Sequence, residues 1–227
     1  MIQAVLTETF PLKVIKGFRC ATINRITGGW IMNQEENTNT SSPEAQKKEV
    51  IFDWVRRSQQ GDSEAMESIY RHFKNRLFSL AYRYTYNPAA AEDILQDTFV
   101  KVFTNLSSLK GEKTFVGWLY RIAINNCLTY IREKKKHLQR TVPLNDVEHM
   151  MSGKKKPVHE KLISKSLEKA IETMPTKLKS VFLLYDVQGF KHEEVAEILG
   201  CSVGTSKSQL FKARMKIRKH LEKNKII

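Results

Sequence analysis

Apolar residues recur at three- and four-residue steps along the middle of the chain, which is the period of an amphipathic helix. In the first such stretch the apolar positions are Ala65, Ile69, Phe73, Leu77, Leu80 and Tyr84. Asp62 or Ser63 can cap its N-terminus. Asn87 and Pro88 end this helix and begin the next, since proline at the first helical position gives up no hydrogen bond. The sequence therefore predicts two consecutive helices that meet at residues 87–88.

The second helix has one apolar and one polar side. Its buried positions are Ala91, Leu95, Phe99, Val102, Phe103 and Leu106, and its polar side carries Asp93, Gln96, Asp97 and Lys101. A third helix is predicted after Thr114, with Phe115, Trp118, Leu119, Ile122 and Ala123 on the buried side. Its basic C-terminal end suits the helix macrodipole. Together the three helices predict a small helical domain.

The helical period stops between residues 137 and 157, where two prolines, a glycine and a lysine run indicate a linker. Helices follow over about 158–173 and 176–186, separated by Met174 and Pro175. No strand pattern of any length occurs after Ile31. We therefore predict an all-α protein with two small domains, over residues 49–136 and 158–227, joined by a flexible linker over 137–157.

Residues 1–48 differ from the rest of the chain. Residues 1–31 have little helical period, and residues 33–48 are polar, which is typical of disorder. The codons of Gly28, Gly29 and Trp30 (GGN, GGN, TGG) are compatible with a ribosome-binding site just before Met32. We expect Met32 to be the true start, and the alternative is a dispensable tail.

The C-terminal stretch 190–221 predicts a helix, a tight turn and a second helix. Gly200 stands where a helix end needs positive φ, and Ser202 can cap the helix that follows. Val203, Leu210, Ala213, Ile217 and Leu221 form its apolar side. The outward side is basic and carries Lys207, Ser208, Gln209, Lys212, Arg214, Lys216, Arg218 and Lys219. A helix of this kind fits the major groove of DNA, although a solvated basic face on an ordinary helical hairpin is the alternative.

The composition favours a polyanionic partner. Lys and Arg number 38 against 24 Asp and Glu in 227 residues, giving a formal net charge of +14. No apolar run approaches the ~20 residues of a membrane-spanning helix, and three widely spaced cysteines indicate neither a disulfide framework nor a thiolate zinc site. We expect a cytoplasmic, nucleoid-associated protein with no membrane insertion.

Enzyme motifs fail on their residues. His192 and Glu193 begin like a zinc-protease HExxH motif, but Ala196 stands where the second histidine is required. The segment from Gly204 to Ser208 has a serine before Lys207 where a phosphate-binding loop needs glycine. We therefore expect no enzymatic activity, no cofactor and no metal.

Three segments together resemble regions two and four of bacterial RNA polymerase sigma factors of the extracytoplasmic-function (ECF) subfamily. They are DILQDTFVKVF (93–103), TFVGWLYRIAINN (114–126) and MPTKLKSVFLLYDVQGFKHEEVAEILGCSVGTSKSQLFKAR (174–214), within a match that spans about 55–222. A helix-turn-helix alone is a weak signal, whereas three motifs in this order are a strong one. The resemblance implies binding to core RNA polymerase and promoter DNA, promoter opening and transcription initiation, with an anti-sigma factor as a further partner.

The resemblance also implies roles for residues. It assigns core polymerase docking to Asp93, Gln96, Asp97 and Lys101, with dipole compensation as the alternative for Asp93. It assigns capture of an unstacked minus-10 base to the loop 107–114 and the helix that follows, through Lys110, Gly111, Lys113, Tyr120, Arg121, Asn125 and Asn126. It assigns recognition of minus-35 DNA to Ser202, Thr205, Lys207, Ser208, Gln209, Phe211, Lys212 and Arg214.

Two questions stay open from the sequence. Phe115 and Trp118 can stack on bases, but their spacing favours the core, and Tyr120 fits either role. Ile124, Thr129, Ser206 and Gln209 depart from the pattern usual in the family, which puts the contacts at those positions in doubt. The alternative function is an autonomous helix-turn-helix regulator that does not bind core polymerase, and it leaves the first domain unexplained.

Overall fold

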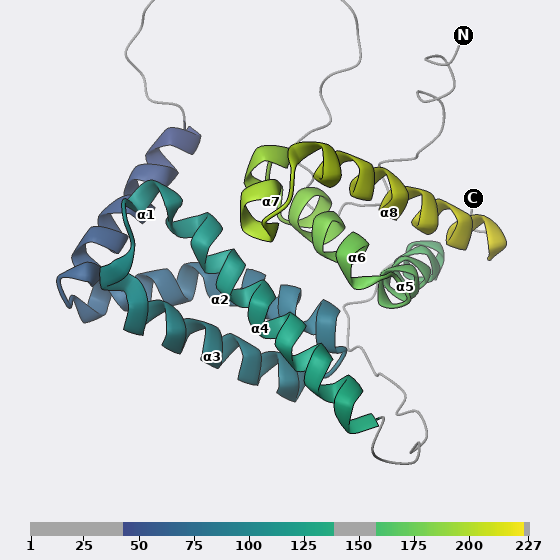
Figure 1. The fold of residues 1–227 in the computed structure, drawn as a ribbon, viewed down its shortest axis with the longest axis horizontal. Coiled ribbons are helices and arrows are strands. Elements are labelled where there is room, and N and C mark those ends of the chain that lie inside the picture. The colour runs from purple at the N-terminus through teal and green to yellow at the C-terminus, as the bar shows by residue number, and fades with distance from the viewer. Residues whose placement is uncertain (1–42, 139–157, 225–227) are drawn as a thin grey trace, which may run out of the picture. The chain divides into compact units, whose positions relative to one another are not determined.

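The structure is a computed structural model that describes residues 43–138 and 158–224 (Figure 1). Every element in these two ranges is helical, as predicted. The elements are α1 (Pro43–Gln59), α2 (Ser63–Thr85), α3 (Pro88–Asn105), η2 (Leu106–Ser108), η3 (Glu112–Thr114), α4 (Phe115–Leu138), α5 (Val158–Glu172), α6 (Thr176–Phe182), η4 (Leu183–Val187), α7 (His192–Leu199) and α8 (Val203–Lys223).

The chain divides into two compact units. One unit contains α1 to α4, and residues 192–206 are grouped with it. The other contains α5, α6, η4 and the part of α8 from Lys207 onward. The domain boundary expected at 137–157 assigns residues 192–206 to the C-terminal domain instead, and that boundary stays a prediction.

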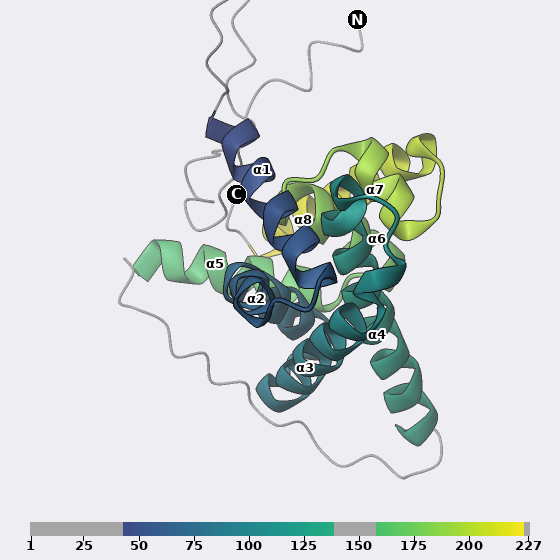
Figure 2. The same cartoon turned by 90° about the vertical axis from the view of Figure 1, so that its left-hand side faces the viewer.

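Helices α1 to α4 form a bundle in which α2 contacts each of the other three helices, and α3 also packs along α4 (Figure 2). The apolar stripe predicted for α2 is buried throughout its length, from Ala65 to Tyr84. Aromatic rings join the helices: Tyr70 meets Phe99 edge-on with centroids 4.8 Å apart, and Phe73 meets Phe115 at 6.0 Å. Burial of this stripe stabilises a bundle whose polar faces stay outside.

Local capping sets where these helices begin. The Asp62 side chain accepts hydrogen bonds from the backbone N–H groups of Glu64 and Ala65, and Asn87 caps α3 in the same way through Ala90. The sequence predicts the Asn87 cap, and Asp62 is one of the two candidates that it gives for α2. The hydrogen bond from Ala65, followed by the one from Arg57, lowers the pKa of the Asp62 carboxyl, so the cap stays ionised and effective near neutral pH.

Helix α1 corrects one prediction. The helix begins at Pro43, whereas the sequence pattern predicts disorder up to residue 48. Ile51 and Val55 are buried one helical turn apart. They form the packed face of the second half of α1, whereas its first turns are polar. The predictions for residues 1–42, including the start at Met32, lie outside the described residues.

The predicted linker is only partly described. Helix α4 continues to Leu138, two residues into the segment that is expected to be a linker, and residues 139–157 lie outside the described ranges. Helix α5 begins at Val158, where the sequence places it.

The second unit contains the predicted break at Met174 and Pro175, after which α6 leads into η4, a π-helical turn over 183–187. Val181, Phe182, Leu183 and Leu184 are all buried. Lys179 is also buried, and its Nζ donates to the backbone carbonyl of Glu172 at 3.3 Å. Burial lowers the pKa of this amine to about 8.

Helices α7 and α8 are joined by the tight turn that the sequence predicts. Gly200 has φ +64, and the backbone N–H of Cys201 donates to the carbonyl of Ala196 at 3.0 Å. This bond is the mark of a Schellman-type helix end. The Ser202 hydroxyl then accepts from the backbone N–H of Thr205 at 3.0 Å and caps α8.

Candidate docking and nucleic-acid interfaces

The polar side of α3 is accessible along its length. Asp93, Gln96 and Asp97 are exposed, as the period predicts, while Leu95, Phe99 and Val102 on the other side are buried. Among the ion pairs of the described residues, none involves Asp93 or Asp97. The face therefore presents two carboxylates to an external partner.

Val100 belongs to the same face, and sequence reasoning missed it. It is 64% exposed and lies one turn beyond Asp97 on the outward side of α3. An apolar residue among exposed acidic and amide groups resembles the centre of a protein interface, where apolar contacts are surrounded by polar ones. The sequence could have revealed this residue, because a valine stands at a position where the helical period predicts a polar side chain.

Lys101 and Asn126 are bonded to each other across the bundle. Lys101 Nζ donates to Asn126 Oδ1 at 2.6 Å, and Asn126 Nδ2 donates to Thr98 Oγ1 at 3.0 Å. Thr98 is wholly buried. Both ends of the Asn126 amide therefore help to hold α4 against α3 in the free protein, and the contacts expected of Asn126 with DNA and of Lys101 with core polymerase stay predictions.

The loop between α3 and α4 presents most of the remaining residues predicted to bind the minus-10 element. Lys110, Gly111 and Lys113 are exposed, and Gly111 has φ +86, which favours glycine. On the first turns of α4, Arg121 and Asn125 are exposed. These five exposed polar and basic residues are together called the loop surface below.

Tyr120 does not belong to the loop surface. Its side chain is 2% exposed, and burial raises the pKa of its hydroxyl. The ring packs in the core, so the structure corrects the expectation that it contacts DNA. Phe115 is likewise wholly buried, whereas Trp118 is half-buried.

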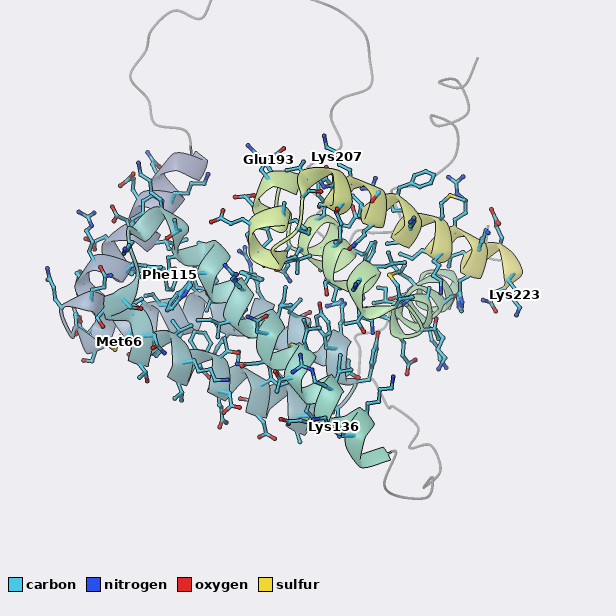
Figure 3. The ribbon with its side chains drawn as sticks, viewed as in Figure 1. Met66, Phe115, Lys136, Glu193, Lys207 and Lys223 are labelled. Carbon is cyan, nitrogen blue, oxygen red and sulfur yellow. The ribbon has the colours of Figure 1, made fainter. Side chains whose placement is uncertain are left out.

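Helix α8 carries the residues predicted to read duplex DNA. Lys207, Ser208 and Lys212 are exposed, and Phe211 is 59% exposed. Figure 3 shows Lys207 near the N-terminal end of the helix and Lys223 at the opposite end. Leu210, Ala213, Ile217 and Leu221 are buried as predicted. The exposed part of this set is called the α8 surface below.

Other predicted members of this set have partners or are less accessible. The hydroxyls of Ser202 and Thr205 lie 2.8 Å apart at the start of the helix, where they belong to the cap. Gln209 is half-buried. Ser206 is wholly buried and its Oγ lies 2.9 Å from His192 Nδ1, so the polar residue that departs from the family pattern has a partner inside the protein.

Arg214 is held by an ion pair that the sequence does not reveal. Its Nη2 and Nε bind the two carboxylate oxygens of Asp186 at 2.6 and 3.1 Å, and its guanidinium lies over the Tyr185 ring at 5.7 Å. Asp186 belongs to η4, 28 residues away. The Arg214 side chain is 54% exposed, so the ion pair gives it a partner inside the protein, while its contact with minus-35 DNA stays a prediction.

The described residues give no sign of membrane or metal chemistry. Within residues 43–138 and 158–224, no helix is long and apolar enough to cross a membrane. In the same ranges, no three His, Cys, Asp or Glu side chains gather closely enough to hold a metal ion.

Comparisons with known proteins match both units. A family model described as Sigma-70 region 2 matches residues 69–137, and one described as Sigma-70, region 4 matches residues 164–217. The ECF RNA polymerase sigma-E factor of Haemophilus influenzae is 30% identical over 178 residues, covering 74% of this chain and 93% of that protein. The ECF RNA polymerase sigma-E factor of Escherichia coli K12 is 32% identical over 170 residues, covering 70% and 88%.

A solved structure has the same fold. It is the sigma factor RpoE in complex with the anti-sigma factor NepR from Bartonella quintana, with a TM-score of 0.57 and 22% sequence identity. The match covers 69% of this chain and 98% of that one. At this level of identity the likeness concerns the fold alone.

Proposed function

Because the chain belongs to the ECF family of RNA polymerase sigma factors, we propose that it binds core RNA polymerase and directs promoter recognition, promoter opening and transcription initiation. One observation carries the proposal: regions two and four of the family are both present, in that order, on one chain. A regulator that acts without polymerase would need only the second of these regions.

The exposed face of α3 is the proposed docking site for core polymerase. Asp93, Gln96 and Asp97 offer charge-assisted hydrogen bonds to a basic partner, and Val100 supplies an apolar centre. Lys101 completes the edge of the face while it holds Asn126. An apolar centre with charges around it favours both affinity and orientation of the partner.

The loop surface is the proposed site for the minus-10 element. Lys110 and Lys113 attract the phosphate backbone, while Arg121 and Asn125 are placed to hydrogen-bond the edge of an unstacked base. Gly111 lets the loop turn sharply and brings backbone groups close to such a base. The energy of binding there favours the separated strands over the duplex.

The α8 surface is the proposed reader of the minus-35 element. An α-helix of this size enters the major groove, where Lys207 and Lys212 meet phosphates and Phe211 can contact a thymine methyl group. Gln209, although half-buried, is the residue with an amide suited to adenine. Arg214, which is paired with Asp186 in the free protein, either contacts this DNA or fixes α8 to η4.

The protein itself performs no covalent chemistry in this proposal, and its site of action is promoter DNA in the cytoplasm. The Bartonella quintana structure with the same fold is a complex with an anti-sigma factor. As the family membership also implies, we propose that this chain has an anti-sigma factor as a further partner.

Binding to purified core polymerase in the absence of DNA tests the proposal. A fluorescently labelled chain should form a stable complex with core polymerase, and Asp97→Lys should weaken it. An autonomous regulator would bind duplex DNA and leave core polymerase unbound. Labelled chain that binds DNA but shows no polymerase-dependent change in anisotropy would overturn the proposed function.

A further inference from the structure

The loop between α3 and α4 is held largely by bonds within itself. The backbone N–H of Leu109 donates to the carbonyl of Leu106 at 3.2 Å, and Thr114 Oγ1 donates to the carbonyl of Gly111 at 2.9 Å. Most of its side chains are exposed. These bonds shape the loop, which also packs against α1, α3 and α4 through η2 and η3. A side-chain tie from outside the loop would add to that packing.

Gln59 supplies such a tie. It is the last residue of α1, and its Nε2 donates to the carbonyl of Leu106 at 3.0 Å and to that of Leu109 at 3.3 Å. An amide nitrogen carries two hydrogens, so one side chain can satisfy both carbonyls at once. Leu106 is buried and Leu109 half-buried, and Gln59 therefore joins the point where the loop leaves the core to a helix about 50 residues earlier.

The end of α1 is itself held in place. Arg57 Nε donates to Asp62 Oδ2 at 2.8 Å, and Arg57 Nη2 lies 2.7 Å from the same oxygen. The other oxygen of Asp62 caps α2. Gly61 between them has φ +89 and allows the tight turn. Gln59 therefore extends from a corner that is fixed to the bundle rather than from a free helix end.

We propose that Gln59 is a positioning residue for promoter opening: it fixes the start of the loop 107–114 so that the loop surface is ordered before DNA arrives. The inference rests on the proposed function, which assigns this loop to the minus-10 element. The family-model match to region 2 begins at residue 69 and does not include Gln59. A loop ordered in advance loses less entropy when it binds, which favours capture of the unstacked base.

Two substitutions with the same change in charge test the proposal. Gln59→Glu keeps the side-chain shape, but a carboxylate cannot donate to the two carbonyls and repels them. The matched control is Gln60→Glu, at an exposed neighbour whose side chain makes no hydrogen bond among the described residues. Gln59→Met removes the donors without adding charge, and circular dichroism establishes that each variant keeps its helicity.

The first measurement uses the free full-length chain. Amide hydrogen exchange over residues 106–114 should become about tenfold faster in Gln59→Glu and Gln59→Met, since the loop loses its external tie. Exchange in Gln60→Glu should match that of the unchanged chain. Unaltered exchange in both Gln59 variants would overturn the inference whether or not the loop contacts DNA.

The second measurement uses the complex with core polymerase on promoter DNA. Permanganate reactivity of minus-10 thymines should fall about tenfold in the Gln59 variants while their affinity for core polymerase stays unchanged. Faster loop exchange with undiminished opening would overturn the role in opening. If the unchanged chain opens no promoter, the proposed function fails instead, and the exchange measurement still decides whether Gln59 holds the loop.

Discussion

Arg214 has a structural partner that the sequence does not reveal. On a helical wheel it lies on the basic side of α8, and that pattern predicts a DNA contact. In the structure its guanidinium makes a bidentate contact with Asp186 and covers the Tyr185 ring. A contact that fills the planar fork of an arginine favours a structural role, in which Arg214 fixes α8 to η4.

Exchange of the two charges tests the role of Arg214. Arg214→Asp alone should lower the stability of the C-terminal helices by about 1 kcal/mol, because the pair is partly exposed. The double variant Asp186→Arg with Arg214→Asp should recover most of that loss in thermal melting, and minus-35 DNA affinity should recover with it. Recovered stability without recovered DNA affinity would show that Arg214 contacts DNA directly.

Lys212 and Gln209 should have separable roles on the same helix. Lys212→Ala should weaken binding to every DNA sequence and reduce the salt dependence by about one counterion, because it removes one phosphate contact. Gln209→Ala should change preference at one base pair and leave the salt dependence unchanged. The control is Lys223→Ala at the far end of α8, which should change neither quantity in titrations of DNA at several salt concentrations.

The buried amine of Lys179 should make stability depend on pH. Its pKa is about 8 in the folded protein and roughly 10.4 in an unfolded chain. The unfolded state therefore binds more protons between these values, so stability should rise with pH across this window. Relative to Lys179→Met, the free energy of unfolding of the unchanged protein should rise by roughly 2 kcal/mol between pH 8 and 10.5, since each unit of pKa difference corresponds to about 1.4 kcal/mol. Thermal melts at several pH values measure this rise.

A second lysine controls for the pH prediction. Lys177 is exposed and lies two residues away on the same helix. Lys177→Met should leave the pH dependence of melting as it is in the unchanged protein. A constant difference between the unchanged protein and Lys179→Met across this pH range would contradict the burial of a charged amine at position 179.

At the scale of elements, the sequence predicts those helices whose signals are local. Asp62, Asn87 and Ser202 cap helices through bonds that span two or three residues, and such bonds follow from the order of residues alone. The apolar stripes of α2, α3 and α8 can be predicted for the same reason, since they follow from the spacing of apolar residues along the chain. Helix α1 escapes prediction because only its second half carries an apolar stripe.

The partners of the site residues that the sequence does not reveal come from distant elements. Asn126 meets Lys101 from 25 residues away, and Arg214 meets Asp186 from 28. Tyr120 differs, because Ala123, Ile124 and Cys127 lie three, four and seven residues further along α4 and are all buried, so the helical period places its ring on the core side. The helical period predicts which face of a helix is exposed. It does not predict which side chain of another helix each residue contacts, because that depends on how the helices pack.

The α3 face supports a prediction about one element. Asp97→Lys should lower affinity for core polymerase by roughly 2–5 kcal/mol if its partner is desolvated in the complex, because a paired charge is reversed. Helicity and melting temperature should change little, since Asp97 is exposed. Glu92→Lys makes the same charge change about 140° away around the helix, and it should have a much smaller effect in the same binding assay.

Two results would contradict docking of core polymerase through Asp97. If polymerase affinity holds in Asp97→Lys while transcription fails, the α3 face serves a later step rather than docking. A loss that is equal in Glu92→Lys and Asp97→Lys would point to long-range charge and not to a specific contact.

At the scale of the whole molecule, the proposed function depends on two domains acting together on one DNA. The sequence predicts a flexible linker over residues 137–157, and the first two of these residues instead belong to α4. A chain severed within 139–157 should lose initiation at ordinary concentrations, because tethering raises the effective concentration of the second contact. Insertions of Gly and Ser should reduce run-off transcription only gradually.

Limited proteolysis checks the same boundary. Cleavage should occur first near Lys154, Lys155 and Lys156, and both fragments should stay helical. Residues 192–206 are grouped with the N-terminal unit, so the outcome also decides whether that grouping matters for folding. Two fragments that cannot stay folded apart would show that the domain boundary is misplaced.

In the proposed function, this chain makes core RNA polymerase start transcription at particular promoters. The most direct measurement is run-off transcription from a library of DNA fragments by core polymerase with and without the purified chain. We predict transcripts that depend on the chain and start downstream of a shared pair of minus-35 and minus-10 elements. Duplex DNA binding by the chain, with no transcript that depends on it from any fragment, would contradict the claim.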